Sequence, residues 1–222
     1  MNESLAREEI CRVGRSLFER GYVHATAGNI SVCLDEDEGG GYLMTPTDAC
    51  LGFLDPARLA RLDADGRQIA GDPASKTLAL HLATYAAARR FDRARCIIHT
   101  HSVHCVALTL KPRTELLDPI TPYFVMKVGH VPVIPYRRPG DPETASLVAA
   151  TIARYGEAGT PIRAVMLERL GPNVWHDAPA AAMAVLEEIE ETARLAWLAR
   201  SAPRPLSETQ IDELRRAFAA RW

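Results

Sequence analysis

Residues 96–105 read CIIHTHSVHC and place three histidines within six positions of an apolar stretch. The β-branched residues in this stretch predict a strand over 95–101 that is followed by a helix. Side chains two positions apart on a strand point to the same face, so we expect the imidazoles of His99 and His101 to lie side by side. Two neutral imidazoles suit a divalent ion such as zinc, but two ordinary polar residues at a strand end would show the same spacing. His104 falls on the following helix, where a helix-start or supporting role is expected.

The composition is that of an ordinary folded protein. Of the 222 residues, 47% are hydrophobic and 24% are charged, which favours one packed core over disorder or a fibrous class. Twenty-six basic and 28 acidic residues give a formal net charge of -2, so no overall field attracts nucleic acid or an acidic membrane. We therefore expect one domain over residues 1–222, with a helical tail from about residue 201.

Cysteine usage and hydropathy indicate the compartment. The five cysteines are scattered and form no CxxC pair, which favours a reducing environment over a disulfide framework. The first twenty residues are charged throughout, and no run of 18 apolar residues occurs, so we expect neither a secretory signal nor a membrane-spanning helix. The expectation is a cytoplasmic protein.

Helical and strand patterns alternate along the chain, which is typical of a single layered α/β domain. Ser75 is a candidate N-cap for the central helix. We expect strands at 29–34, 42–47, 95–101, 130–136 and 164–170, and helices at 4–19, 77–89, 103–110, 142–155, 178–200 and just after 208.

Four motifs together resemble the class II aldolase and adducin family. They are TAGNIS (26–31), MTPT (44–47), PASK (73–76) and HTHSVHC (99–105), in the family's order. The resemblance covers roughly residues 5–200 and implies a three-layer α/β/α sandwich around a large, mainly antiparallel sheet. It also implies a fourfold-symmetric homotetramer with active sites between subunits. Finally, it implies a divalent metal at His99 and His101, with zinc first and manganese or cobalt as alternatives.

The same resemblance implies a phosphate pocket at Gly28, Asn29, Thr47 and Ser75. The chemistry of these residues agrees, because backbone N–H groups, short hydroxyls and an amide are suitable donors to an oxyanion. Without the resemblance, Gly28-Asn29 would be read as a tight turn.

Three positions depart from the family pattern. Thr77 stands where the aldolases have a glutamate that binds the metal and abstracts a proton, and Lys76 replaces a serine. Leu170 stands where the family has its third histidine ligand. Threonine cannot abstract a carbon-bound proton, whereas loss of CO2 from a β-keto acid reaches the same enediolate without that step.

The missing histidine leaves the metal ligand set open. A zinc site normally needs three protein ligands and a water. Glu168, His176 or His104 could complete the set, and substrate oxygens could do so as well.

Longer stretches resemble the branch of the family that decarboxylates 3-oxo-tetronate 4-phosphate to dihydroxyacetone phosphate and CO2. They are residues 10–21, 44–66, 120–142 and 186–195. In this reading Tyr123 reaches into a neighbouring subunit's site as the acid that protonates the enediolate, and Lys76 places a cation near the departing carboxylate. A core tyrosine and a solvated helix-start lysine are the alternatives. Arg137 could contact phosphate or carboxylate, or form a surface ion pair.

Two other functions stay open. One is a sugar-phosphate aldolase or epimerase of the same family, against which Thr77 argues. The other is a non-catalytic interaction module of the adducin kind, which the loss of two ligand residues makes plausible.

Overall fold

The computed structural model describes residues 1–199 and 203–222. The helices are α1 (Glu3–Glu19), α2 (Leu78–Ala88), α3 (Val103–Leu108), α4 (Pro122–Lys127), α5 (Pro142–Glu157), α6 (Pro179–Leu198) and α7 (Glu208–Phe218). The strands are β1 (Asn29–Cys33), β2 (Tyr42–Met44), β3 (Ala60–Leu62), β4 (Gln68–Ala70), β5 (Cys96–His99), β6 (Val133–Ile134), β7 (Ala164–Leu167) and β8 (Gly171–His176).

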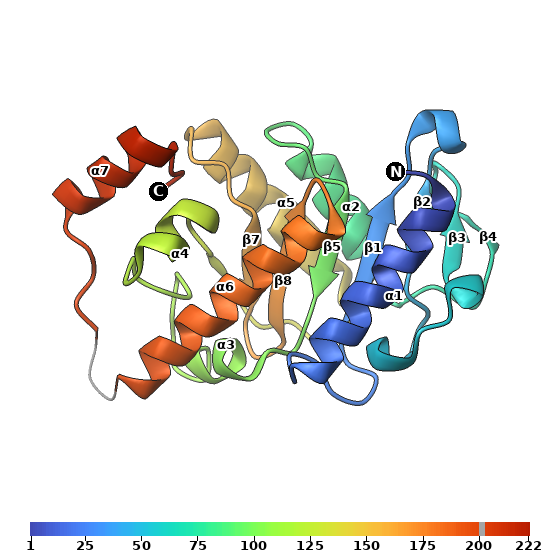
Figure 1. Cartoon of the computed structure of the whole chain (residues 1–222), viewed down its shortest axis with the longest axis horizontal. Helices are drawn as coiled ribbons and strands as arrows, with labels where there is room; N and C mark the ends of the chain where they lie inside the picture. Colours follow the sequence, from blue (N-terminus) through green and yellow to red (C-terminus); the bar gives the residue numbers. More distant parts are fainter. Residues whose placement is uncertain (200–202) are drawn as a thin grey trace.

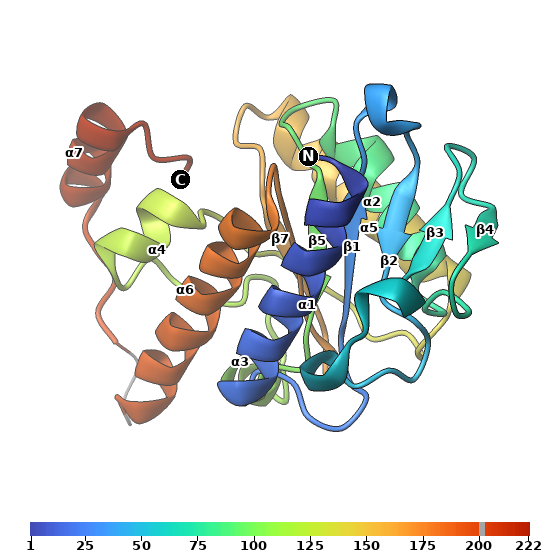
Figure 2. The ribbon, with the colours of Figure 1, turned by 45° about the vertical axis from the view of Figure 1, so that its right-hand side comes forward.

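One sheet of eight strands divides the molecule, in the order β4-β3-β2-β1-β5-β8-β7-β6. Every neighbouring pair is antiparallel except β6 and β7. Helices α1 and α6 lie over one face, while α2 and α5 lie behind the sheet (Figure 1). The turned view in Figure 2 separates these layers. The predicted three-layer α/β/α sandwich with a mainly antiparallel sheet is confirmed.

The alternation of side chains along β5 divides the core into two parts. Cys96 and Ile98 pack in the cluster under α1 and α6, whereas Ile97 packs in the cluster under α2 and α5. His99 therefore points to the same side as Ile97. The register aligns His99 with Asn29 on β1 and Asn173 on β8, so a row of polar residues crosses the middle of the sheet on the α2 and α5 side.

Several predicted boundaries need correction. The strand predicted over 95–101 ends at His99, because its ladder to β1 stops at Asn29. Ser75 is not the N-cap of α2, since Thr77 occupies that position without a side-chain cap bond. The predicted helix α6 ends at Leu198, and the predicted start of the tail at 201 lies outside the described residues.

The proline-rich stretch before β6 contains a helix that the sequence patterns did not predict. Thr121 accepts a hydrogen bond from the N–H of Phe124 at 3.1 Å, and Pro122 occupies the first turn of α4. Both are ordinary start signals for a helix. Within the described parts of the chain, no helix is both long and apolar enough to cross a membrane.

A buried histidine links α2 to the sheet. His81 is fully buried, and its Nδ1 lies 2.7 Å from the Ser31 hydroxyl. Burial lowers the pKa of His81 to about 3, with a smaller contribution from nearby His99. The imidazole is therefore neutral in the folded protein at pH values where it is charged in the unfolded chain.

We expect His81→Gln to flatten the acid side of the stability curve. The unfolded chain takes up a proton near the ordinary histidine pKa and the folded protein does not, so stability falls as pH drops from about 6.5 towards 3. This site alone contributes a slope approaching ~1.4 kcal/mol per pH unit in that window. Urea denaturation at several pH values measures the slope, and an unchanged slope in the variant would contradict the assignment.

Candidate active site

A cavity of about 290 Å³ opens at the end of the sheet where β1 begins and β5 ends. The amino-terminal residues of α2 and α5 form part of its wall. All residues predicted to bind phosphate or metal, and Lys76, line this one cavity: Gly28, Asn29, Thr47, Ser75, Lys76, His99 and His101. The motifs, which lie up to 73 residues apart in sequence (from 28 to 101), therefore converge in space.

The two histidines are close together and neutral. The Nδ1 of His99 lies 3.0 Å from the Pro172 carbonyl oxygen; because that oxygen can only accept, the ring donates there and Nε2 keeps its lone pair. The ring centroids of His99 and His101 are 5.2 Å apart. Burial, and then the neighbouring His101, lowers the pKa of His99 to about 4, and burial also lowers the pKa of His101. Neutral imidazole is the form that binds a metal.

This pair is a suitable donor set for a divalent ion, though an incomplete one. The backbone carbonyl that fixes the His99 tautomer is the usual support behind a metal-binding histidine. Across residues 1–199 and 203–222, no three His, Cys, Asp or Glu side chains are grouped so that they could hold a metal. The ring of His24, which the sequence patterns did not single out, lies 6.3 Å from that of His101. Among the described residues, the cavity thus offers two neighbouring imidazoles and no third side-chain ligand grouped with them.

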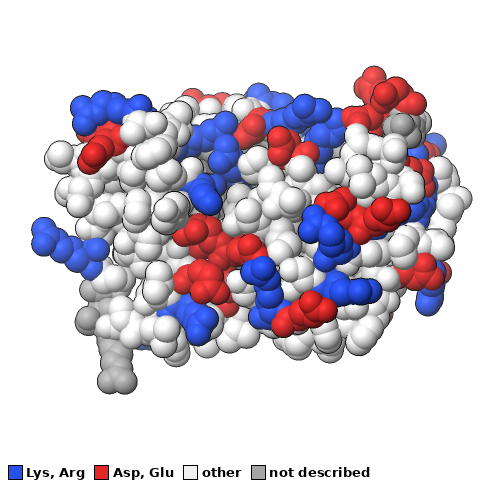
Figure 3. Space-filling model, viewed as in Figure 1, with Lys and Arg blue, Asp and Glu red and all other residues white. Residues whose placement is uncertain are grey.

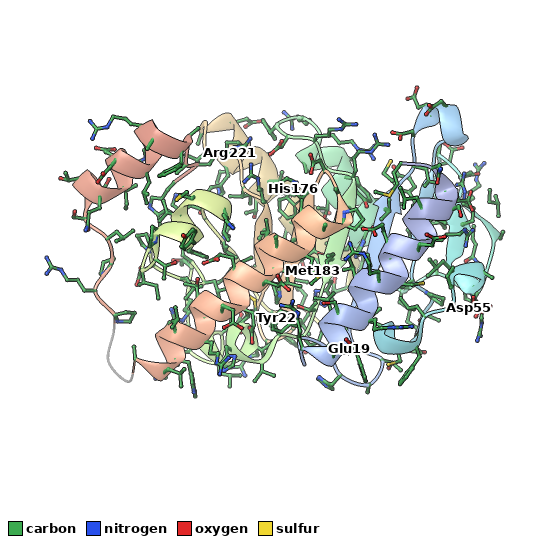
Figure 4. All side chains as sticks on the ribbon, viewed as in Figure 1. Glu19, Tyr22, Asp55, His176, Met183 and Arg221 are labelled. Atoms are coloured by element: carbon green, nitrogen blue, oxygen red, sulfur yellow. The ribbon has the colours of Figure 1, made fainter. Side chains whose placement is uncertain are left out.

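Neither Glu168 nor His176 completes the ligand set. The strand β7 ends at Leu167, and the Glu168 carboxylate turns away to accept the N–H of Tyr136 at 2.9 Å. His176 lies at the far end of β8, where its Nδ1 is 2.5 Å from an Asp177 oxygen; Figure 4 labels it there. Both predictions assumed strand geometry that would carry these side chains to the cavity.

His104 is also engaged elsewhere. Its Nδ1 lies 2.7 Å from Glu190 Oε1 on α6, and its backbone N–H donates to the same oxygen at 3.0 Å. The N–H of Cys105 donates to the other carboxylate oxygen at 3.0 Å. His104, the third histidine of the motif, therefore links α3 to α6 through hydrogen bonds to Glu190.

The predicted phosphate residues form a tight corner. Gly28 has φ +83°, and a Cβ there would lie 2.8 Å from the His99 carbonyl oxygen, so the backbone needs glycine at this point. Asn29 is only 6% exposed, and its side-chain oxygen has no hydrogen-bond partner. The N–H of Thr47 is used by the Pro73 carbonyl at 2.8 Å, so Thr47 has its hydroxyl to offer.

The departures from the family pattern also face the cavity. Thr77 and Leu170 both contribute to its wall, which is where the resemblance places the missing ligands. Thr77 Oγ1 lies 3.1 Å from the Ser75 hydroxyl. Lys76 is exposed, with Nζ 3.7 Å from an Asp48 oxygen, so its ammonium can move towards an anion in the cavity.

Tyr123 lies elsewhere on the chain. It is 59% exposed on α4, with Lys127 Nζ 5.6 Å from the ring centroid. No described residue of α4 lines the cavity of its own chain. Arg137 forms a surface ion pair, which was one of the two roles predicted for it, with Nε 2.8 Å from a Glu143 oxygen. The neighbouring Arg138, which the sequence patterns passed over, lines the cavity instead.

The chain is similar to several known proteins over nearly its whole length. The family model of the class II aldolase and adducin N-terminal domain matches residues 8–197. A 3-oxo-tetronate 4-phosphate decarboxylase of Cupriavidus necator is 49% identical over 228 aligned positions, covering 99% of both chains. The protein of that name from Escherichia coli K12 is 39% identical and covers 96% of both. The crystal structure of YgbL from Klebsiella pneumoniae has a TM-score of 0.86 at 38% identity, covering 97% of this chain and 100% of that one. The chain therefore belongs to the class II aldolase and adducin family.

Proposed function

We propose that this chain is a carboxy-lyase that converts 3-oxo-tetronate 4-phosphate to dihydroxyacetone phosphate and CO2. Relatives that carry this activity in their names match nearly the whole chain, one of them at 49% identity. The observation that carries the proposal is the single cavity in which the phosphate corner and the histidine pair meet. A phosphorylated ketone needs both features side by side.

In this mechanism the phosphate enters the corner formed by Gly28, Asn29, Thr47 and Ser75. The hydroxyls of Thr47 and Ser75 are suitable donors to an oxyanion, whereas the backbone N–H groups of these two residues already donate to the Pro73 and Thr45 carbonyl oxygens. The neutral rings of His99 and His101 face the ketone. A divalent ion bound by them, with zinc first and manganese or cobalt as alternatives, would supply positive charge next to the ketone oxygen.

The bond between C1 and C2 then breaks. CO2 leaves from C1, and the electron pair of that bond forms the enediolate across C2 and C3. A proton is added at C2 to give dihydroxyacetone phosphate. No C–H bond is broken before CO2 leaves, so this reaction needs no proton-abstracting base at position 77. The presence of Thr77 in the cavity wall is consistent with that.

Two residues complete the proposal. Lys76 places an ammonium near the departing carboxylate and helps to bind it. Tyr123 protonates the enediolate of a neighbouring subunit, because it is exposed on α4 and does not line its own cavity. This role requires an oligomer whose active sites lie between subunits, and we propose a homotetramer of this kind for a cytoplasmic enzyme.

The test is a CO2-release assay on purified chain with and without added zinc. We expect turnover of 3-oxo-tetronate 4-phosphate and none of L-fuculose 1-phosphate, together with a divalent ion retained through dialysis. Retro-aldol cleavage of the second compound would instead indicate an aldolase. A metal-free protein inert towards both would indicate an interaction module.

A further inference from the structure

Arg138 is a cation in the cavity wall that no step described above uses. It lies in the loop between β6 and α5, two residues before Gly140, which has a φ of +79°. Its Nε is 3.8 Å from an Asp141 oxygen, and its side chain is 74% exposed. Such a long, exposed contact contributes little, so the guanidinium is available to a stronger anion. Asp141 is itself occupied as the N-cap of α5, where it accepts the N–H of Glu143.

The adjacent Arg137 differs both in its ion pair and in its position relative to the cavity. Arg137 holds Glu143 with two hydrogen bonds, of 2.8 and 3.1 Å, and is absent from the cavity wall. The two arginines have the same charge and are neighbours in sequence, but only Arg138 faces the cavity. Arg137 is therefore a matched control for any effect of charge alone.

The cavity has a polar side chain that is built to meet a ligand. Asn29 is 6% exposed and lines the cavity, yet its side-chain oxygen has no hydrogen-bond partner. A buried acceptor left unpaired costs free energy, which a ligand can recover with a donor such as a hydroxyl group; the substrate has one at C2. The amino termini of α2 and α5 also open onto this space, and both present partial positive charge to it.

The order of these groups along the sheet matches the order of groups in the proposed substrate. The phosphate corner lies on the β2 and β1 side, the histidine pair at the end of β5, and Arg138 in the loop that leaves β6 beyond β8 and β7. In 3-oxo-tetronate 4-phosphate the phosphate, the ketone and the carboxylate follow one another along the chain. With phosphate in its corner and ketone at the histidines, the carboxylate extends towards Arg138.

We infer that Arg138, which lines the same cavity as the histidine pair, binds the substrate carboxylate and selects phosphorylated 3-oxo acids over sugar phosphates that lack a carboxylate. This inference rests on the proposed function. The planar guanidinium suits a carboxylate because it can form two parallel hydrogen bonds. The contact exists before CO2 leaves, so its loss is expected to raise KM more than it lowers kcat.

The experiment compares wild type, Arg138→Ala and Arg137→Ala by calorimetric binding of two probes. Erythronate 4-phosphate has the phosphate and the carboxylate but no ketone, so it cannot lose CO2 as a β-keto acid does. Dihydroxyacetone phosphate has the phosphate and the ketone but no carboxylate. We expect Arg138→Ala to weaken the first probe by about tenfold or more and the second by less than about twofold. Arg137→Ala is expected to leave both affinities near wild type, and circular dichroism checks that each variant is folded.

Three results would overturn the inference. They are equal weakening of both probes by Arg138→Ala, the same affinities in the two arginine variants, and a wild-type protein that does not bind erythronate 4-phosphate. Turnover separates this question from the proposed function. If wild type discriminates the probes through Arg138 but releases no CO2, the proposed reaction fails while the carboxylate site stands. If Arg138→Ala turns over substrate with wild-type KM, the reaction stands while the carboxylate site fails.

Discussion

Replacing His99 with alanine is expected to abolish retained divalent metal and to slow CO2 release by about a hundredfold or more. The variant keeps one of the two imidazoles that face the cavity, and a single imidazole is too poor a donor set to retain an ion through dialysis. Metal content by mass spectrometry and the CO2-release assay measure the two effects separately.

His176→Ala is the matched control for this experiment. It removes an imidazole from the neighbouring strand, at the opposite end from the cavity, where His176 pairs in register with Cys96. We expect wild-type metal content and turnover in this variant. Undiminished CO2 release in His99→Ala would remove the histidine pair from the mechanism.

Tyr123→Phe is expected to lower kcat by about a hundredfold or more, with little change in KM, because general acid catalysis typically contributes that much. The phenylalanine keeps the ring beside Lys127 and removes only the hydroxyl. Tyr123 is exposed and does not line the cavity of its own chain, so the proposed mechanism assigns its hydroxyl to the site of a neighbouring subunit.

Mixing the two inactive variants tests that placement directly. Co-expressed His99→Ala and Tyr123→Phe chains should regain activity, because about a quarter of sites in randomly mixed oligomers combine an intact His99 with an intact Tyr123. Each variant alone has no such site. Mixed oligomers without activity would exclude action between subunits, and a monomeric wild type would do the same.

The charged side chains on the face that carries α1 and α6 are of both signs (Figure 3). Basic and acidic side chains alternate there without a continuous basic area (Figure 3). Tyr22, labelled in Figure 4, donates from its hydroxyl to Glu191 on α6 at 3.1 Å, and Arg20 pairs with Glu187. Several of the charges on this face therefore hold α1 against α6.

The sequence was sufficient for the fold because its motifs and its periodicity agree. Amphipathic spacing located α1 and α6, and β-branched content located the central strand β5. The motif order then placed Asn29, Ser75 and His99 in one cavity, although they come from three separate elements. Such order constrains position well, since each motif is attached to the end of a strand or the start of a helix.

The predictions that were wrong depended on details of backbone geometry that sequence periodicity does not encode. The strand β7 ends at Leu167, and Arg169 takes a positive φ of +63°, so Glu168 does not share the strand face that the prediction assumed, although Leu170 still lines the cavity. Periodicity could not tell which of two adjacent arginines would line the cavity. Arg137 pairs with Glu143, and Arg138 lines the cavity. The helix α4 had a readable signal in Thr121 and Pro122, which the surrounding prolines obscured.

The anchoring of α3 by Glu190 has a consequence for any alanine scan of the histidine motif. Glu190 is 4% exposed and receives the bonds from His104 and Cys105. Removing the His104 ring deletes one hydrogen bond to a buried carboxylate and weakens the packing of α3 on α6. Any loss of activity would therefore follow from reduced stability. Lower turnover in that variant would come with a lower melting temperature. The same loss of turnover in a His99 variant would instead reflect the loss of a group that takes part in the reaction.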